Sequence, residues 1–312
     1  MEGLRCLIIA GPTASGKSAL ALEIAERFGG EIVNADSRQV YRFMDVGTAK
    51  PSAADRRRVP HHLFDVVTPA EPFDAACYHQ LARAAVREIS ARGRLPVVVG
   101  GTGLYIRVLI RGLFRGPSAI PRLRCWLGQR EEAAPGILYR WCRRLDPPIA
   151  ERIHPNDRVR LVRALEVALA TGERMSAHQE RHGFGDRLGT VLYLVVDPGV
   201  ESLKRRIRWR SVELFEGGLV DEVRSLWERG FGPDLAPMRS IGYVEAGRVL
   251  RCQSSVANAI DELVRSTERF AKRQRTWFRS ESDAAWVSPG TDRTAILEGV
   301  RRLVEAPARA SL

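Results

Sequence analysis

Residues 11–18 have the types and the spacing of a phosphate-binding loop. They read Gly-Pro-Thr-Ala-Ser-Gly-Lys-Ser and fit the pattern GxxxxGK[ST], between an expected strand and an expected helix. In such a loop the backbone N–H groups turn toward phosphate oxygens, and the helix N-terminus adds positive potential. Lys17 can neutralise the terminal phosphate, and Ser18 can bind Mg²⁺. The sequence therefore predicts a diphosphate site made by Gly11, Thr13, Ala14, Ser15, Gly16, Lys17 and Ser18.

The carboxylate that could act beside these phosphates does not follow the strand on which ATP or GTP hydrolysis would require it. ATP or GTP hydrolysis in such a loop needs an apolar strand that ends in Asp or Glu, yet the strand over 97–99 ends in Gly100-Gly101-Thr102. Asp36 instead follows the expected strand over 31–35. Neighbouring strand ends share one crevice in an open sheet, which predicts that Asp36 and Thr102 meet there. Asp36 is then either a general base that removes a proton as diphosphate departs, or a residue that caps its loop or supports a Mg²⁺ ligand.

Alternating strands and helices are expected to position these residues. Short apolar runs, typical of buried parallel strands, occur at 6–10, 31–35 and 95–99. One helix is expected over 19–28, stopped by Gly29-Gly30, a second from the N-cap Asp74 to Gly93, and a third opening near Gly103. This alternation predicts an α/β fold with a parallel sheet that is covered on both faces.

The stretch over 115–190 has a different composition. It is rich in Arg, contains several Pro and has helical segments such as Arg160–Thr171, but it lacks strand-like runs until 191–196. We therefore expect two parts, a catalytic core over 1–114 and 191–312, and a helical insertion over 115–190. The last residues, 306–312, are expected to be disordered.

Composition limits the class of protein without deciding it. The net charge of +12 and the pI of about 10.1 suit a polyanionic partner, but a composition that favours Arg explains them equally well. The five cysteines form no CxxC pair, which predicts free thiols in a reducing compartment. We see neither a signal peptide nor an apolar run long enough to span a membrane, and we expect a cytoplasmic protein. His61 and His62 are expected to be structural.

A basic run near the C-terminus falls on one helical face. Arg269, Lys272, Arg273 and Thr276 recur at positions i, i+3, i+4 and i+7, and Trp277 and Phe278 follow them. Basic residues mixed with aromatic residues suit RNA phosphates and bases. A solvated basic face above core aromatics explains the same pattern.

Eight segments, taken together and in order, resemble one family, the tRNA dimethylallyltransferases, also called tRNA isopentenyltransferases. They are GPTASGKS (11–18), NADSRQVYR (34–42), VGTAKP (46–51), VPHHLFD (59–65), GGTGLY (100–105), HPNDRVRLVRALEV (154–167), IGYVEA (241–246) and AKRQRTWFR (271–279).

The resemblance implies a P-loop nucleotide-kinase-like core with a helical insertion that grips the anticodon stem. It implies transfer of a dimethylallyl group from dimethylallyl diphosphate to N6 of the adenosine 3′-adjacent to the anticodon, by a monomer assisted by Mg²⁺ at Ser18. Asp36 matches the general base, Thr102 the residue beside the amine, and Lys17 and Arg224 the groups on the diphosphate. The matching tRNA contacts are Asp36, Ser37, Arg38, Gln39, Arg124, Lys272, Arg273, Gln274, Thr276, Trp277 and Arg279.

Two departures and three rival functions remain beside this resemblance. Thr267-Glu268 stands where the family usually has Thr-Arg, and Pro121 and Pro135 can shift helix ends in the insertion. The rivals are a P-loop nucleoside or nucleotide kinase that binds ATP, a non-catalytic RNA-binding protein with a relic loop, and a transferase whose acceptor is a free adenine nucleotide.

Overall fold

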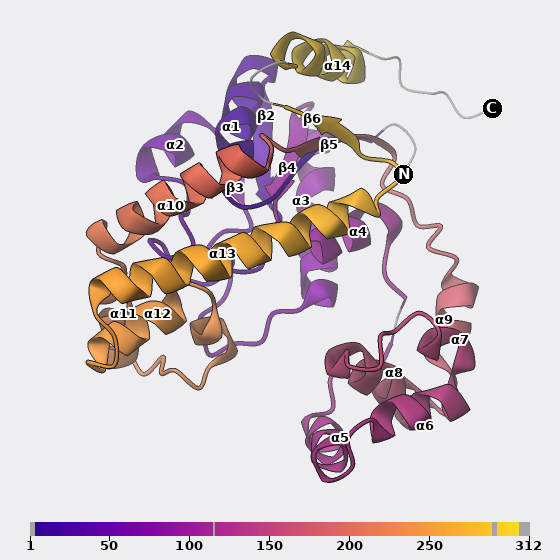
Figure 1. Ribbon diagram of the computed structural model, residues 1–312. Helices are drawn as coiled ribbons and strands as arrows, with labels where there is room; N and C mark the ends of the chain where they lie inside the picture. The colour runs from indigo at the N-terminus through magenta and orange to yellow at the C-terminus, as the bar shows by residue number, and fades with distance from the viewer. Residues whose placement is uncertain (1–3, 115, 289–291, 306–312) are drawn as a thin grey trace, which may run out of the picture. The chain divides into compact units, whose positions relative to one another are not determined.

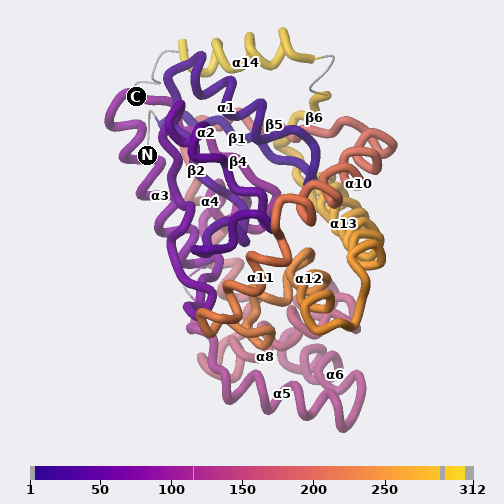
Figure 2. The backbone as a smooth tube through the Cα atoms, turned by 90° about the vertical axis from the view of Figure 1, so that its left-hand side faces the viewer, coloured from indigo at the N-terminus to yellow at the C-terminus, as the bar shows by residue number. Residues whose placement is uncertain are grey.

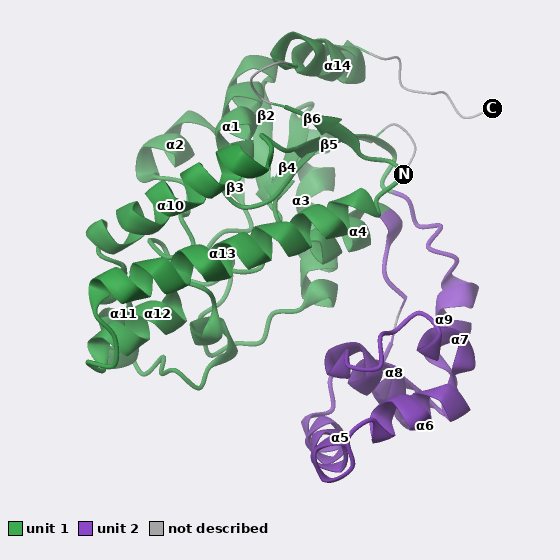
Figure 3. Cartoon of the chain, viewed as in Figure 1, with its two compact units in different colours: residues 1–110, 188–312 green, residues 111–187 purple. Residues whose placement is uncertain are grey.

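The computed structural model describes residues 4–114, 116–288 and 292–305, so the predicted disordered segment 306–312 lies outside it. The chain forms two compact units (Figure 3). The core unit contains residues 1–110 and 188–312, and the helical unit contains residues 111–187. Within the described residues, none of the helices is long and apolar enough to cross a membrane.

A parallel sheet forms the centre of the core unit (Figure 1). In the described part of the chain it has six strands in the order β3-β2-β4-β1-β5-β6, and every neighbouring pair is parallel. The strands are β1 (Arg5–Ala10), β2 (Gly30–Asn34), β3 (His61–His62), β4 (Leu95–Gly100), β5 (Thr190–Val196) and β6 (Ala285–Val287). The predicted α/β class and parallel sheet are thus confirmed, and the predicted strands each lie within a residue of their observed ends.

Helices of the core unit cover both faces of this sheet. They are α1 (Lys17–Phe28), α2 (Ala53–Arg58), α3 (Ala75–Ala91), α4 (Gly103–Arg111), α10 (Val200–Glu216), α11 (Leu219–Glu228), α12 (Tyr243–Leu250), α13 (Val256–Arg279), α14 (Arg293–Glu305) and the short 3₁₀ helix η1 (Ala236–Arg239). Helix α3 begins after Asp74, whose side chain accepts hydrogen bonds from the next amides, so the predicted N-cap is confirmed. Helices α1 and α3 lie on opposite sides of the sheet (Figure 2).

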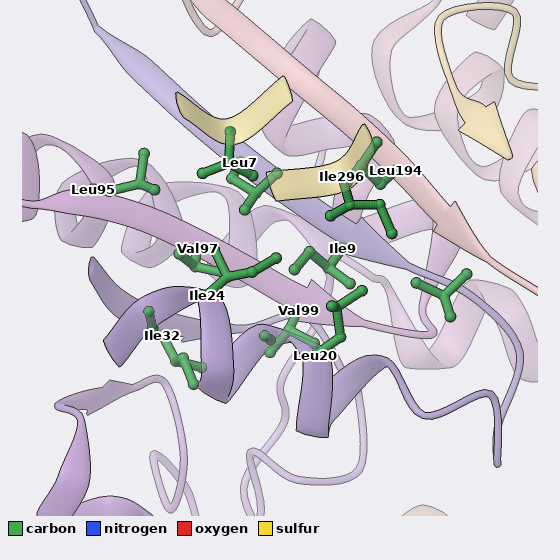
Figure 4. Packing of buried hydrophobic residues seen from close by; sticks show 14 of the residues in the cluster. Leu7, Ile9, Leu20, Ile24, Ile32, Leu95, Val97, Val99, Leu194 and Ile296 are labelled. Atoms are coloured by element: carbon green, nitrogen blue, oxygen red, sulfur yellow. The ribbon is translucent and has the colours of Figure 1, made fainter. Parts of the chain in front are cut away.

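Alternation along the strands explains why both faces are covered. Leu7 and Ile9 of β1 pack with Ile24 of α1 and Ile296 of α14 on one face (Figure 4). Cys6 and Ile8, which alternate with them, are equally buried. A strand buried on both faces is a continuous apolar run, as the sequence of β1 shows.

A second apolar cluster holds the helices beyond β5 together. Phe215 of α10, Leu219 and Val223 of α11, Tyr243 of α12 and Leu263 of α13 contribute to it. The segment over 40–46 also packs into this cluster through buried apolar side chains. Helices α10 and α13 contact each other along their length and run side by side (Figure 1).

The helical unit has an apolar core of its own. Its helices are α5 (Pro121–Ala133), α6 (Ile137–Leu145), α7 (Pro147–Ala150), α8 (Arg158–Thr171) and α9 (Met175–His182). Leu127, Leu138, Ile149 and Leu161 are buried against one another. The chain leaves the core unit after Ile110 and returns at Leu188, and the Leu188 N–H donates a hydrogen bond to the Ile110 carbonyl over 3.0 Å. The two ends of the segment therefore meet, as an insertion requires.

Candidate active site

The loop over 11–18 joins β1 to α1 and borders a cavity in the core unit. Gly16 adopts a left-handed conformation (φ 92°) and is the N-cap of α1, so no side chain caps the first amides of this helix. Uncapped amides at a helix start bind phosphate oxygens. The lining residues from this loop are Thr13, Ala14, Lys17 and Ser18, whereas Gly11 and Ser15 are buried and Gly16 is exposed.

Two cations and one carboxylate face the cavity near this loop. Burial lowers the pKa of Lys17 to about 8, while the Asp36 carboxylate raises it and the Arg210 guanidinium lowers it. Burial likewise lowers the pKa of Arg210, against the raising effect of Asp36. The Lys17 ammonium donates to the Pro12 carbonyl over 3.1 Å. Partly enclosed cations gain most from a bound anion, so this wall suits a diphosphate.

Asp36 is held at the end of β2 by a small network. The Asn34 side chain accepts from the Asp36 N–H over 2.9 Å and donates to the Asp36 carbonyl over 3.1 Å. Asp36 Oδ1 accepts from the Arg38 N–H over 2.8 Å, so the carboxylate does cap its own loop. Among the described residues, its Oδ2 atom has no hydrogen-bond partner. One carboxylate oxygen therefore fixes the loop while the other remains available in the cavity.

Thr102 lies directly beside this loop, as predicted for residues at the ends of neighbouring parallel strands. Its N–H donates to the Ala35 carbonyl over 3.1 Å, and its Oγ1 accepts from the Ser37 N–H over 2.9 Å. The ends of β2 and β4 are thus linked by hydrogen bonds immediately before and after Asp36. Asp36 and Thr102 both line the cavity, as do Ser37, Arg38 and Gln39.

Arg210 lines the cavity near the phosphate-binding loop, whereas Arg224 does not line it. Arg224 lies on α11, whose apolar residues Leu219 and Val223 face the core, so Arg224 points outward and pairs with Asp221 one helical turn earlier. It is not among the residues that line the cavity. Arg210 lies on α10 with Ile207 and Ser211 of the same face, all three in the cavity wall. The predicted contact between Arg224 and the diphosphate stays a prediction, and Arg210 is a second candidate for that contact.

The cavity is large enough for more than a diphosphate. Its volume is about 840 Å³, and all of its lining residues belong to the core unit. Besides the polar wall it has apolar lining residues from several elements, namely Leu22, Val99, Ile207, Leu214, Ile241 and Phe270. A site that joins an apolar region to a few convergent polar groups is typical of small-molecule binding.

A half-buried carboxylate fixes the path of a loop that lines the cavity. Glu222 of α11 accepts hydrogen bonds from the backbone N–H groups of Asp45, Val46 and Gly47 over 2.6–3.0 Å. It also accepts from the Tyr243 hydroxyl over 2.6 Å. The following residues of this loop line the cavity, so Glu222 fixes their path.

Gln39 also binds the loop over 45–51. Its amide donates to the carbonyls of Thr48 and Ala49 over 3.0 and 3.1 Å. The predicted tRNA-contacting segment 36–39 is therefore tied both to Thr102 and to the loop over 45–51.

The predicted RNA-binding residues of α13 separate into two groups. Lys272, Arg273, Thr276 and Arg279 are exposed, and Arg273 also lines the cavity. Trp277 is half-buried, and the Arg107 guanidinium lies 4.2 Å above its ring. The basic residues form an outer face, as the helical spacing predicts.

Gln274 belongs to the inner face of α13 and is 6% exposed. Its side-chain amide accepts from the Thr13 N–H over 2.9 Å and donates to the Gly101 carbonyl over 2.8 Å. The amide is engaged within the protein as an internal bridge, and the predicted contact between Gln274 and tRNA stays a prediction. The spacing of buried Leu263, Ala271 and Phe278 places Gln274 on this face.

Arg124 lies in the helical unit and pairs with a buried carboxylate. Its guanidinium donates to both oxygens of Glu166 over 2.8 Å. Burial raises the pKa of Glu166, but hydrogen bonds from Arg124, the Ile120 N–H and Arg163 together lower it to about 2. The part of Arg124 that remains exposed can still meet RNA, because 43% of its side-chain surface is accessible.

The two departures from the family pattern have simple structural settings. Glu268 lines a shallow groove with Lys204, Arg208 and Trp209 of α10, and it is not among the residues that line the main cavity. Pro121 is the first residue of α5, where a missing N–H costs nothing. Pro135 lies between α5 and α6.

The residues near Ser18 fit a Mg²⁺ ion that is bound mainly through a substrate. Among the described residues, no group of three His, Cys, Asp or Glu side chains could hold a metal ion. Ser18 and Asp36 both line the cavity, which offers Mg²⁺ a hydroxyl oxygen and a carboxylate oxygen. Mg²⁺ commonly takes one or two protein oxygens together with phosphate oxygens and water.

Comparisons with known proteins point to one family. A family model described as IPP transferase matches residues 39–281. The tRNA dimethylallyltransferase 1 of Citrifermentans bemidjiense is 47% identical over 295 residues, which cover 94% of this chain and 95% of that one. The tRNA dimethylallyltransferase of Geobacter metallireducens is 49% identical over 294 residues, which cover 93% of this chain and 94% of that one.

Solved structures have the same fold along nearly the whole chain. The tRNA isopentenylpyrophosphate transferase of Bacillus halodurans is 34% identical, with a TM-score of 0.70 and coverage of 97% of both chains. A eukaryotic dimethylallyltransferase acting on tRNA is 26% identical, with a TM-score of 0.81 and coverage of 98% of this chain and 81% of that one. With a family model that matches most of its length and relatives near 50% identity, this chain belongs to the IPP transferase family, that of the tRNA dimethylallyltransferases.

Proposed function

We propose that this protein transfers a dimethylallyl group from dimethylallyl diphosphate to N6 of the adenosine 3′-adjacent to the anticodon in tRNA. One observation carries the proposal. A single cavity brings together a phosphate-binding loop with Lys17, the cation Arg210, and the pair Asp36 and Thr102. The first group suits a leaving diphosphate, and the second suits an amine that must lose a proton.

The reaction follows from the acceptor's weak nucleophilicity. The N6 lone pair is delocalised into the adenine ring, so removing a proton during attack lowers the barrier. N6 forms a bond to the first allylic carbon, and the carbon–oxygen bond breaks with its electron pair going to the diphosphate. Asp36 takes the N6 proton through its free Oδ2. Thr102, linked to Ser37, lies where it can bind the same amine.

The departing diphosphate gathers charge in front of fixed donors. Lys17, Arg210 and the uncapped amides of α1 stabilise that charge as it develops. We assign to Arg210 the role that the resemblance gave to Arg224, because Arg210 lines the cavity beside Lys17 and Arg224 does not line it. Mg²⁺, with Ser18 as its protein ligand, supplies further charge neutralisation on the diphosphate when it is bound.

The rest of the chain is proposed to hold RNA. The outer face of α13 meets RNA phosphates through Lys272, Arg273 and Arg279, which are all exposed. The helical unit grips the anticodon stem, and the reacting base leaves its stack to enter the cavity. We propose that the protein acts on this substrate in the cytoplasm, as a monomer.

The rival functions make different demands on the same site. A nucleotide kinase would turn over ATP without RNA, and a relic RNA-binding protein would not need Asp36, Thr102, Lys17 and Arg210 in one cavity. A transferase that prenylates free adenine nucleotides would not need the helical unit. Incubation with the allylic diphosphate and either tRNA or AMP separates them. We expect a prenylated product with tRNA alone; product from AMP at an equal rate, or ATP hydrolysis without RNA, would overturn the proposal.

A further inference from the structure

A single buried side chain joins the two halves of the proposed reaction site. Gln274 accepts from the Thr13 N–H in the phosphate-binding loop over 2.9 Å and donates to the Gly101 carbonyl, next to Thr102, over 2.8 Å. Thr102 in turn accepts from the Ser37 N–H beside Asp36. A path of hydrogen bonds, joined by the peptide link from Gly101 to Thr102, therefore runs from the donor loop to the acceptor residues.

The chemistry of this bridge requires a carboxamide of this length. The Thr13 N–H needs an acceptor and the Gly101 carbonyl needs a donor, and one amide supplies both. A carboxylate lacks the donor, and a thioether lacks both strong groups. The fit is close, because a Cβ atom on Gly101 would lie 2.3 Å from Gln274 Nε2. Gly101 is thus the residue that lets the amide approach.

The neighbours of Gln274 anchor α13 to other strand ends. Arg275 donates to Asp197, at the end of β5, over 2.8 Å. Trp277 packs directly against Gly103 at the start of α4. These contacts fix the rotation of the helix, so its inner residues cannot turn outward. Lys272 and Arg273, in the same two turns, are exposed.

We propose that Gln274 is a positioning residue for prenyl transfer, which sets the separation between the phosphate-binding loop and the Thr102–Asp36 pair. The inference rests on the proposed function, because it assigns the diphosphate to one end of the bridge and the amine to the other. Both polar groups of the Gln274 amide are engaged by the protein. It acts through Thr13 and Gly101, from the helix whose outer face is proposed to bind RNA.

The bridge predicts a specific kinetic effect. A displacement of one reactant relative to the other slows the chemical step even when both substrates are bound. Gln274→Met keeps the size and loses both hydrogen bonds, so its single-turnover rate at saturating substrates should fall roughly 10-fold or more. Its tRNA affinity and the salt dependence of that affinity should equal those of the wild type, because the outer face of α13 is unchanged.

The test compares this variant with two others. Gln274→Asn retains the amide but is one methylene short, so it can reach only one partner and should be slow in the same way. Gln80→Met, on the exposed surface of α3, is the matched control and should match the wild type in every measurement. Thermal unfolding of each variant reports stability, and should Gln274→Met fail to fold, Gln274→Asn supplies the measurement.

Each outcome has one meaning. A slow chemical step with normal tRNA binding supports the positioning role. Loss of thermal stability with a normal single-turnover rate would show that Gln274 has only a structural role. Weakened tRNA binding with a normal rate would show that Gln274 is an RNA contact. Either result overturns the inference. If the wild-type protein transfers no dimethylallyl group to tRNA, the proposed function fails. If the wild-type protein is active and Gln274→Met has a normal rate, only the inference about Gln274 fails.

Discussion

The backbone N–H of Ser37 donates a hydrogen bond over 2.9 Å to Oγ1 of Thr102, which ties the loop after β2 to the end of β4. Two residues that are 65 positions apart thereby flank one side of the cavity. Asp36 lies directly before Ser37, and its Oδ1 is fixed by the Arg38 N–H. Its orientation is therefore set before any substrate binds, as a general base requires.

Asp36→Asn should remove the base and leave its setting intact. An asparagine Oδ1 can still accept from the Arg38 N–H, so the loop should keep its conformation. We expect the single-turnover rate of prenyl transfer to fall by roughly 10² or more, the usual effect of losing a general base, with tRNA affinity unchanged. A near-normal rate would show that Asp36 only caps its loop and is not the general base.

The pKa of Lys17 should make donor binding depend on pH. In the free protein burial lowers this pKa to about 8, so the ammonium loses its proton as the pH rises through about 8. A bound diphosphate favours the charged form, so affinity should decrease above about pH 8 and binding should take up protons there. Calorimetry in buffers with different ionisation enthalpies measures this uptake with a non-reactive donor analogue.

Lys17→Ala is the control for that measurement. It should weaken binding of the analogue and of inorganic diphosphate, and it should abolish the proton uptake. Equal proton uptake in Lys17→Ala and the wild type would show that another group titrates. If the wild-type protein sustained ATP hydrolysis and Lys17→Ala abolished it, the kinase function would be favoured.

Single charges on the outer face of α13 should appear in the salt dependence of tRNA binding. Removing one phosphate contact, by Lys272→Ala or Arg273→Ala, should lower the slope of log affinity against log salt by roughly one unit. Arg301→Ala, an equally exposed arginine on α14, is the control and should leave the slope unchanged. Should neither α13 variant change the slope, this helix face is merely solvated.

The helical unit should be removable without unfolding the core. Its ends meet through the hydrogen bond from Leu188 to Ile110, so a short flexible linker can replace residues 111–187. All residues that line the cavity lie in the core unit, and the shortened protein should still bind a donor analogue in calorimetry. It should lose most of its affinity for tRNA in a mobility-shift assay. An unfolded product, or full tRNA affinity, would contradict the proposed division of roles.

The sequence alone predicts the features that depend on local patterns. Apolar runs marked the central strands, and the spacing of Gly16, Lys17 and Ser18 marked the loop before α1. Asp36 and Thr102 were predicted to meet because parallel strands end at one edge of a sheet, and the structure places both in one cavity.

Residues whose partners come from distant segments were harder to predict. Arg210 had a local signal, since it shares a helical face with Ile207 and Ser211, but many arginines offer such a pattern. Gln274 also had one, as a polar residue on an otherwise apolar face of α13. Glu222 had none, because the three amides that it binds lie more than 170 residues earlier in the chain.

Mass spectrometry of tRNA nucleosides tests the central claim most directly. Unmodified tRNA would be incubated with dimethylallyl diphosphate, Mg²⁺ and the wild-type protein or Asp36→Asn, and then digested to nucleosides. We predict N6-isopentenyladenosine, from the adenosine 3′-adjacent to the anticodon, in the wild-type reaction and a much smaller yield with Asp36→Asn at the same early time. Unaltered adenosine at that position in the wild-type reaction, or equal yields from the two proteins, would contradict the mechanism that the cavity supports.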